Sequence, residues 1–395
     1  MSYVDESQHG DQEFGTIIGM LQASVERYGT QTAIEDGQVV LSFAELSDAV
    51  EQVAAGLMAL KIKRGDRVAI WAPNMWRWVV AALAIHQVGG VLVPINTRYK
   101  GEEAAYILAK SKARALIVLS SFLGNDYVSM LRKTGVDLPD LKHTVIIAGK
   151  DVPGCMSWWQ MVEGGMQIEE DMLFQRSTEV RPDDPCDILF TSGTTGHPKG
   201  VVCSHRQTLR VFRDWSHIVG LTDDDRYLVV APFFHCFGYK AGWLAALMMG
   251  ATILPQRTFD VDAVLKRLGP DRVSVLPGPP ALYQTLLARS DLADHDLSTL
   301  RLAVTGAAVI PVELIERMRT ELGFETVVTG YGLTESCGVV TMCRFDDDPE
   351  TIATTSGRAI PDVEVQVVDD AGVEVANGEP GEVIVRGYNV MTGYF

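Results

Sequence analysis

The stretch LFTSGTTGHPKG, residues 189–200, gathers hydroxyl groups, glycines and one lysine directly after an apolar run. Glycine-rich turns let backbone N–H groups converge on one point, and Ser and Thr hydroxyls add donors, which is how many proteins cradle phosphate. Lys199 would add a positive charge for the outer phosphates. The segment is not a Walker A loop, which needs lysine directly after glycine, because Lys199 follows Pro198. A flexible strand-to-helix turn is the alternative interpretation.

Two later segments carry further chemistry. PFFHCFGYKAG, residues 232–242, places His235 after an aromatic pair, and TGYGLTE, residues 329–335, ends on Thr334 and Glu335. A lone histidine beside an apolar run is most often a satisfied core residue. A Thr-Glu pair also starts helices well. Each segment, taken alone, therefore allows a structural interpretation as well as a chemical one.

Taken together, these segments resemble the motifs of the adenylate-forming superfamily, which contains acyl-CoA synthetases, peptide-synthetase adenylation domains and luciferases. LFTSGTTGHPKG resembles its phosphate loop, PFFHCFGYKAG its acyl-pocket segment and TGYGLTE its Y-G-x-T-E motif. TGAAVIP, residues 305–311, resembles the adenine-side loop, and GEVIVRG, residues 381–387, a later strand motif. The resemblance implies a ligase in which a carboxylate attacks the α-phosphate of ATP, giving acyl-AMP and pyrophosphate, and CoA then displaces AMP.

The resemblance also implies roles for individual residues, with ATP, Mg²⁺ and CoA as cofactors and co-substrates. The residues implied to bind the β- and γ-phosphates are Thr191, Ser192, Gly193, Thr194, Thr195, Gly196 and Lys199. Those implied on the adenine and α-phosphate side are Gly306, Ala307, Ala308, Tyr331, Gly332 and Thr334. The implied Mg²⁺ ligands are Glu335 and Thr191, and the implied catalytic residues are Lys199, His235, Thr334 and Glu335. The acid would meet His235, Phe237, Gly238, Tyr239 and Lys240. His235 would position the carboxylate, because a carboxylate nucleophile needs no general base.

The identity of the acid is narrowed only in part. The acyl-pocket segment lacks the aspartate with which amino-acid-activating relatives pair the α-amino group, so an amino acid is disfavoured. Residues 70–99, 232–242 and 276–287 resemble actinobacterial acyl-CoA ligases of steroid catabolism, which implies a steroid-derived bicyclic propanoate. Tyr239 and Lys240 would then donate to its ketone oxygens, with a solvated or helix-starting lysine as the alternative.

Three other functions remain open. The first is a medium- or long-chain fatty-acid–CoA ligase. The second is an acyl-AMP ligase that serves a carrier protein, although the run from Glu335 to Gly357 is short for the insertion those ligases carry. The third is a catalytically inactive nucleotide-binding module.

These motifs must be positioned by an alternating series of helices and strands. The pattern predicts helices over 102–112, 261–268 and 311–322, and a further helix starting near Val201. It predicts strands over 113–119, 186–190, 272–276 and 326–329, and a buried helix followed by a strand over 78–95. The strands are continuous apolar runs, typical of parallel strands covered on both faces in βαβ units. The fold class is therefore α/β, with two βαβ-layered subdomains of mostly parallel sheet, residues 1–180 and 181–350.

After about Thr351 the pattern changes to short alternating strands broken by Asp-Ala-Gly and Asn-Gly. This predicts an antiparallel hairpin, the start of a small β-barrel subdomain over residues 351–395. The superfamily's small C-terminal domain, with its T-G-D motif, hinge and lysine, is expected to be absent from these residues. We therefore expect a fragment of a longer protein that binds nucleotide weakly and turns over poorly.

Composition excludes several classes of partner. The 395 residues carry a formal net charge of −17, which disfavours nucleic acid and anionic membranes. No basic and apolar leader is present, and His86, Gly89, Gly90 and Pro94 interrupt the most apolar run, so no transmembrane segment is predicted. Six scattered cysteines predict reduced thiols in the cytoplasm, and eight histidines without ligand spacing predict no structural metal. Some superfamily members are dimers, so the resemblance allows a homodimer, but no residue pattern marks an interface and the sequence does not determine the oligomeric state.

Overall fold

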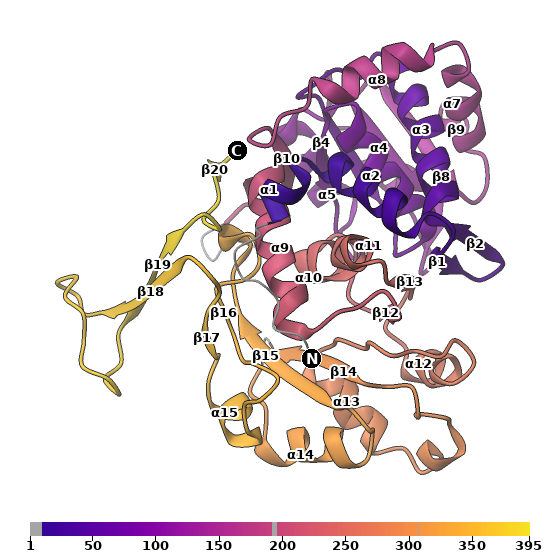
Figure 1. Ribbon diagram of the computed structural model, residues 1–395. Helices are drawn as coiled ribbons and strands as arrows, with labels where there is room; N and C mark the ends of the chain where they lie inside the picture. Colours follow the sequence, from indigo (N-terminus) through magenta and orange to yellow (C-terminus); the bar gives the residue numbers. More distant parts are fainter. Residues whose placement is uncertain (1–9, 192–195, 307) are drawn as a thin grey trace.

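Figure 1 shows the computed structural model, which describes residues 10–191, 196–306 and 308–395. The N-terminal part of the chain forms one body of helices around a sheet, and the middle of the chain forms a second body. Helix α9 (His205–Val219) lies between them, and a C-terminal hairpin projects to one side. Among the described residues, no helix has both the length and the apolar character needed to cross a bilayer.

The first sheet has eight strands in the order β20-β11-β10-β4-β3-β5-β8-β9. From β10 to β9 all neighbours run parallel, whereas the β10–β11 and β11–β20 pairs are antiparallel. Strands β3 to β5 are almost wholly buried apolar runs, as a parallel sheet covered on both faces requires. The bounds are β3 (Arg67–Trp71), β4 (Val91–Pro94), β5 (Ala115–Leu119), β8 (His143–Ala148), β9 (Met156–Ser157), β10 (Pro185–Thr191), β11 (Lys199–Ser204) and β20 (Gly393–Tyr394).

Helices pack around this sheet (Figure 1). Their bounds are α1 (Gly10–Phe14), α2 (Ile17–Tyr28), α3 (Phe43–Ala59), α4 (Trp76–Gln87), α5 (Gly101–Ser111), α6 (Tyr127–Lys133), α7 (Trp158–Gly165) and α8 (Glu170–Thr178). A short hairpin of β6 (Ser121–Phe122) and β7 (Asn125–Asp126) precedes α6. The helix and strand predicted over 78–95 are α4 and β4, and the helix predicted over 102–112 is α5. Both predictions are confirmed in type.

The second body contains two four-stranded groups, β12-β13-β1-β2 and β14-β15-β16-β17. Val275 bridges in parallel to both Tyr227 and Leu302 and so joins the two groups. The strand predicted over 272–276 is therefore reduced to one bridging residue. The bounds are β1 (Thr32–Asp36), β2 (Val39–Ser42), β12 (Arg226–Val229), β13 (Thr252–Pro255), β14 (Leu302–Gly306), β15 (Thr326–Tyr331), β16 (Thr341–Met342) and β17 (Arg358–Ala359).

Short helices connect these strands, and the helices predicted over 261–268 and 311–322 are α12 and α14. The bounds are α10 (Cys236–Gly238), a π-helical turn (Tyr239–Leu244), α11 (Ala245–Met249), α12 (Val261–Leu268), α13 (Pro280–Leu287), α14 (Val312–Thr320) and α15 (Pro349–Thr354). Two 3₁₀ turns cover Leu292–Asp294 and Thr334–Ser336.

Sheet membership crosses the predicted subdomain limit at 180/181. Strands β1 and β2, from the start of the chain, belong to the second body, whereas β10 and β11 belong to the first sheet. The chain therefore passes between the bodies more than once. The limits 1–180, 181–350 and 351–395 remain a prediction.

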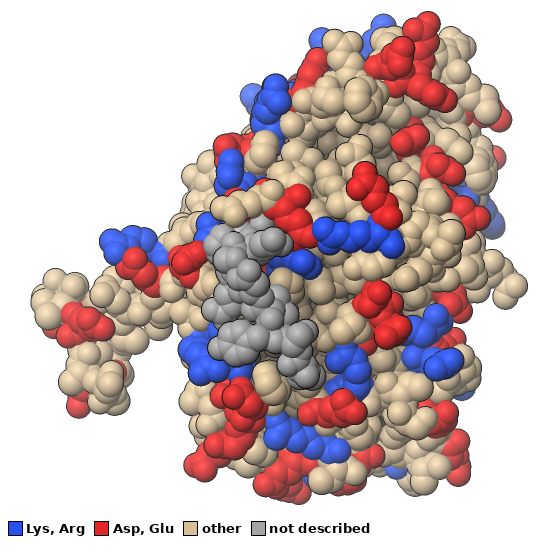
Figure 2. Space-filling model, in the orientation of Figure 1, with Lys and Arg blue, Asp and Glu red and all other residues tan. Residues whose placement is uncertain are grey.

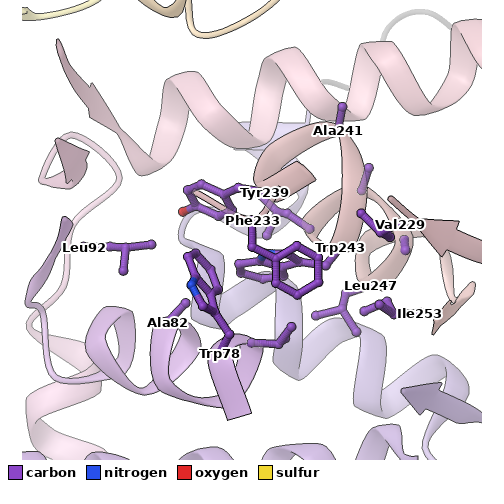
Figure 3. Close-up of a cluster of buried hydrophobic side chains, with 14 of the residues drawn as sticks. Trp78, Ala82, Leu92, Val229, Phe233, Tyr239, Ala241, Trp243, Leu247 and Ile253 are labelled. Carbon is purple, nitrogen blue, oxygen red and sulfur yellow. The ribbon is translucent and has the colours of Figure 1, made fainter. Parts of the chain in front are cut away.

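The two bodies share a hydrophobic core where α4 meets the segment around the π-helical turn (Figure 3). Trp78 of α4 packs edge-on against Phe233, with ring centroids 5.5 Å apart, and Tyr239 stacks on Trp243 at 4.9 Å. All four side chains are fully buried. This contact fixes the acyl-pocket segment against the first body.

The projecting hairpin consists of β18 (Val363–Val368) and β19 (Glu382–Gly387), paired antiparallel from Val363 opposite Gly387 to Val368 opposite Glu382. It extends away from the rest of the chain in Figures 1 and 2. The antiparallel hairpin predicted after Thr351 is therefore confirmed.

Candidate functional site

One cavity of about 1600 Å³ lies between the two bodies. Its lining comes from the β10–β11 hairpin, the acyl-pocket segment, the end of β14, the turn after β15 and the end of the chain. The predicted site residues that line it are Thr191, Lys199, His235, Phe237, Gly306, Ala308, Tyr331, Gly332, Thr334 and Glu335. Segments separated by well over a hundred residues in the sequence therefore meet at one place.

The phosphate-loop segment is flanked by the antiparallel strands β10 and β11. Thr191 pairs with Lys199 and Phe190 with Gly200, so the chain leaves the loop as strand β11. The helix predicted near Val201 is therefore wrong: it begins at His205, where Ser204 and Gln207 form a capping box. Ser192, Gly193, Thr194 and Thr195 lie outside the described residues.

Close packing fixes residues 197–200, where the chain enters strand β11. A Cβ at Gly200 would lie 2.7 Å from Ile188 Cγ2, so glycine is required there. The Tyr106 hydroxyl donates to the Pro198 carbonyl oxygen at 3.1 Å, and its ring stacks on His197 at 4.8 Å. Gly196 has φ +137° and is exposed, and Lys199 is exposed and lines the cavity.

The Y-G-x-T-E segment turns sharply after strand β15. A Cβ at Gly332 would lie 2.2 Å from the Gly338 carbonyl oxygen, so this position also requires glycine. The Ser336 hydroxyl accepts from Leu333 N at 2.9 Å and closes the 3₁₀ turn that carries Thr334 and Glu335. This turn presents a carboxylate to the cavity, where it is held by the hydroxyl of Tyr394 at 2.9 Å.

On the adenine side, β14 and β15 end together, with Gly306 paired to Gly330. Gly306, Ala308 and the half-buried Tyr331 line the cavity beyond these strand ends. Small residues allow a planar group to approach the backbone closely. Ala307 lies outside the described residues.

His235 is exposed to the cavity and caps the short helix α10. Its Nδ1 accepts a hydrogen bond from Phe237 N at 3.2 Å, so in the neutral ring Nε2 carries the proton. Partial burial among the cavity walls lowers the pKa of this imidazole below its ordinary value. A neutral ring with a proton on Nε2 can donate to a carboxylate, as the positioning role requires.

Tyr239 and Lys240 do not reach the cavity. Both are fully buried, and neither is among the lining residues. Tyr239 OH lies 3.0 Å from His86 Nε2, and Lys240 Nζ lies 3.0 Å from Asp187 Oδ2. The expectation that these two side chains meet ketone oxygens is therefore wrong, because each already has a buried partner.

Gly238 is also buried and does not line the cavity. A Cβ there would lie 2.2 Å from the Pro232 carbonyl oxygen. Glycine is therefore needed at this position because the backbone packs closely, and not because the residue contacts the acid, as was expected.

The apolar wall of the cavity was not predicted from the sequence. It comes from α9, from the acyl-pocket segment and from residues next to the motifs, and comprises Phe212, Trp215, Val230, Ala241, Val304 and Val339. The signal available was the apolar stripe at helical spacing in residues 205–219, because Leu209, Phe212 and Val219 share one face. Asn74 was also missed: it donates to the carbonyl oxygens of Val229 and Ala231 and accepts from Phe233 N, which positions the acyl-pocket segment.

The charges around the cavity differ from those of the whole chain. Acidic and basic side chains are interspersed over the face drawn in Figure 2, and the chain as a whole is strongly acidic. Among the described lining residues, Arg98, Lys199 and Arg257 outnumber Asp260 and Glu335. The cavity therefore suits anionic ligands better than the rest of the molecule does.

The chain matches the family model for AMP-binding enzymes over residues 21–395. It is 45% identical over 382 residues to the 3-[(3aS,4S,7aS)-7a-methyl-1,5-dioxo-octahydro-1H-inden-4-yl]propanoyl:CoA ligase of Rhodococcus jostii, and 46% identical over 379 residues to that of Mycobacterium tuberculosis. Each match covers 96% of this chain and 72% of the relative. A solved structure of the anthranilate CoA ligase AuaEII with anthranoyl-AMP superposes with a TM-score of 0.88 at 25% identity, covering 96% of this chain and 71% of that one.

The chain therefore belongs to the AMP-binding enzyme family. Within that family it is an acid–thiol ligase of the acyl-CoA ligase class, and such ligases use ATP, Mg²⁺ and CoA. The predicted fold class, α/β with mostly parallel sheets, is confirmed.

Proposed function

We propose that the protein activates a steroid-derived bicyclic propanoate as its acyl-AMP and passes the acyl group to CoA. The observation that carries this proposal is one cavity that joins an exposed lysine, a carboxylate, a neutral histidine and a wide apolar wall. The two relatives named for an indane-dione propanoate share 45% and 46% identity with the chain. The apolar wall formed by Phe212, Trp215 and Val230 suits a bulky hydrocarbon skeleton.

The proposed roles follow from where the side chains lie. Lys199 and Thr191 would hold the β- and γ-phosphates, with their charge neutralised as pyrophosphate leaves. Thr334 would donate to the α-phosphate, and Tyr331 would pack on adenine beside Gly306. His235 Nε2–H would hold the substrate carboxylate in line with the α-phosphorus of ATP. The two anions would then react from fixed positions instead of having to meet in solution.

The same donor set fits a magnesium ion. Glu335 and Thr191 bring carboxylate and hydroxyl oxygens to the same cavity, and Mg²⁺ prefers hard oxygen ligands. The ion, when bound, supplies charge neutralisation for the phosphates. The side chain of Glu335 would hold it.

The test is product analysis with ATP, Mg²⁺ and CoA, run on the purified protein as its whole gene encodes it. The acids are the bicyclic dioxo-propanoate and linear acids of medium and long chain, and mass spectrometry measures acyl-AMP and thioester separately. Thioester from the bicyclic acid in clear preference supports the proposal. A preference for linear acids assigns a fatty-acid–CoA ligase instead, acyl-AMP alone points to a carrier-protein acceptor, and no product points to an inactive nucleotide-binding module.

A matched pair of variants tests the site itself. Glu335→Gln is expected to lower adenylate formation by about 100-fold or more, since loss of a metal ligand removes several kcal/mol of charge stabilisation. Glu325→Gln makes the same change at an exposed carboxylate outside the cavity lining and is expected to keep the wild-type rate. Equal rates in the two variants would remove Glu335 from the site.

We also propose a cytoplasmic location and a homodimer. The cysteines of the chain are free thiols, five of them buried, which suits a reducing compartment. Light scattering during size-exclusion chromatography measures the mass in solution, and a mass near the chain's 43.2 kDa would contradict the dimer.

A further inference from the structure

Tyr394, near the end of the chain, lies between two residues of the proposed site. Its hydroxyl donates to Glu335 Oε1 at 2.9 Å, and Lys199 Nζ lies 5.1 Å from the centroid of its ring. Tyr394 also lines the cavity. Tyr394 lies outside the motifs that resemble those of the superfamily.

The backbone holds Tyr394 in place independently of its hydroxyl. In strand β20 it pairs with Val201 of β11, next to the phosphate hairpin. On either side, Thr392 N donates to the Val202 carbonyl oxygen at 3.0 Å and Phe395 N to that of Gly200 at 2.8 Å. The ring is therefore attached to the strand that carries Lys199.

A second set of bonds joins the same segment to the turn that carries Glu335. Met391 N donates to the Glu335 carbonyl oxygen at 2.8 Å. Two residues earlier, the fully buried Asn389 donates from Nδ2 to the Val339 carbonyl oxygen at 2.9 Å. Residues 389–395 therefore connect the Glu335 turn to strand β11, and Tyr394 contacts both of them.

We propose that Tyr394 is a positioning residue for the adenylation step, one that orients the Glu335 carboxylate for the metal and holds the Lys199 ammonium over its ring. The inference rests on the proposed function. A donor on Oε1 leaves Oε2 available to a cation, and hydrogen-bonded partners of ligating residues commonly change metal affinity by about 10- to 100-fold. The ring face attracts the ammonium and limits where it moves.

The test measures Mn²⁺ binding by electron paramagnetic resonance in the presence of ATP, with no turnover required. Tyr394→Phe, which keeps the ring, is expected to weaken Mn²⁺ binding by about 10-fold. The effect should vanish in a Glu335→Gln background, because the hydroxyl then has no ligating carboxylate to orient. Tyr394→Leu should in addition raise the KM for ATP, whereas Tyr394→Phe should not, because only the first removes the ring beside Lys199.

The control is Tyr388→Phe. Tyr388 lies in the same segment and also donates to a carboxylate, Asp214 Oδ2 at 2.6 Å, but it does not line the cavity. Mn²⁺ affinity in this variant is expected to match the wild type. If Tyr388→Phe weakened binding as much as Tyr394→Phe, general loosening of the segment would explain both and the inference would be overturned.

Other results overturn it as well. Unchanged or tighter Mn²⁺ binding in Tyr394→Phe would mean that the phenol does not orient the carboxylate. Should that variant fold poorly, ¹³C-tyrosine NMR of Glu335→Gln at neutral pH replaces it, and a Tyr394 chemical shift unchanged from that of the wild type excludes the contact. A wild-type protein that binds no Mn²⁺ with ATP would contradict the proposed function itself, which distinguishes the two failures.

Discussion

Lys240 offers the sharpest test of the internal electrostatics. Its ammonium is fully buried, lies 3.0 Å from the equally buried Asp187 carboxylate and donates to Cys337 Sγ at 3.4 Å. Burial alone would lower the pKa of Lys240, but Asp187 and the nearby thiols raise it well above its ordinary value. The Lys240 ammonium is therefore charged in the folded protein at neutral pH. Lys240→Met leaves Asp187 as a buried carboxylate without its cation.

The expected cost follows from that arrangement. Removing one partner of a buried ion pair typically destabilises a protein by about 3–5 kcal/mol, because the remaining charge has lost its solvent and its counter-ion. The Cys186 thiol, which donates to Asp187 Oδ2 at 3.2 Å, offsets only a small part of this loss. Neutralising Asp187 as well should restore most of the lost stability. Lys240→Met/Asp187→Asn is therefore expected to be more stable than Lys240→Met alone.

Urea unfolding followed by circular dichroism and tryptophan fluorescence measures the effect. The control is Arg386→Met, which breaks an ion pair with Glu364 whose side chains are 82% and 62% exposed and should cost less than about 1 kcal/mol. A Lys240→Met protein within 1 kcal/mol of wild type would refute the account, as would a double variant no more stable than the single one. At temperatures where Lys240→Met stays folded, the preference among acids should be unchanged.

Three further predictions concern pH, backbone strain and pocket size. Burial holds the pKa of the His205 imidazole at about 4, so unfolding takes up a proton between pH 6.5 and 4. The free energy of unfolding should therefore fall as pH drops through this window, by up to about 1.4 kcal/mol per pH unit, and an unaltered slope in His205→Asn would contradict this assignment. Gly357→Ala should destabilise the protein far more than Gly37→Ala. Both glycines have positive φ, but a Cβ at Gly357 would lie 2.0 Å from the backbone atom Met342 C, whereas a Cβ at Gly37 would meet nothing. Equal urea midpoints for the two variants would contradict this prediction. Ala241→Leu should lower kcat/KM for bulky acids more than for small ones, and an equal loss for both would place Ala241 outside the acyl pocket.

The sequence predicted those parts of the fold in which local pattern and burial agree. Strand β10 was predicted because its residues form a largely apolar run, and helix α12 because its apolar residues recur at helical spacing. The segment after Lys199 was mistaken for a helix because Gly-rich phosphate loops often precede helices. The β-branched pair Val201-Val202, followed by the capping sequence Ser204-x-x-Gln207, could have indicated a strand first.

The candidate site was predicted where a motif carries its own chemistry, and missed where the partner is distant. The neighbour that neutralises Lys240 is Asp187, 53 positions earlier in the chain. Tyr394 reaches Glu335 across 59 positions. Neither contact produces a local sequence pattern, because no spacing rule connects residues that come together only when the chain folds.

The hairpin of β18 and β19 also bears on how copies of this protein behave at high concentration. Its strands pair with each other, and Val383 and Ile384 are 46% and 42% exposed, so apolar side chains accompany open backbone groups at the strand edges. Such edges can recruit a strand from another molecule. Acidic side chains outnumber basic ones along the hairpin and repel a second copy; they are Glu364, Asp369, Asp370, Glu374, Glu379 and Glu382. Because salt shortens the reach of that repulsion to about 10 Å at 0.1 M, colloidal stability should decline as ionic strength rises.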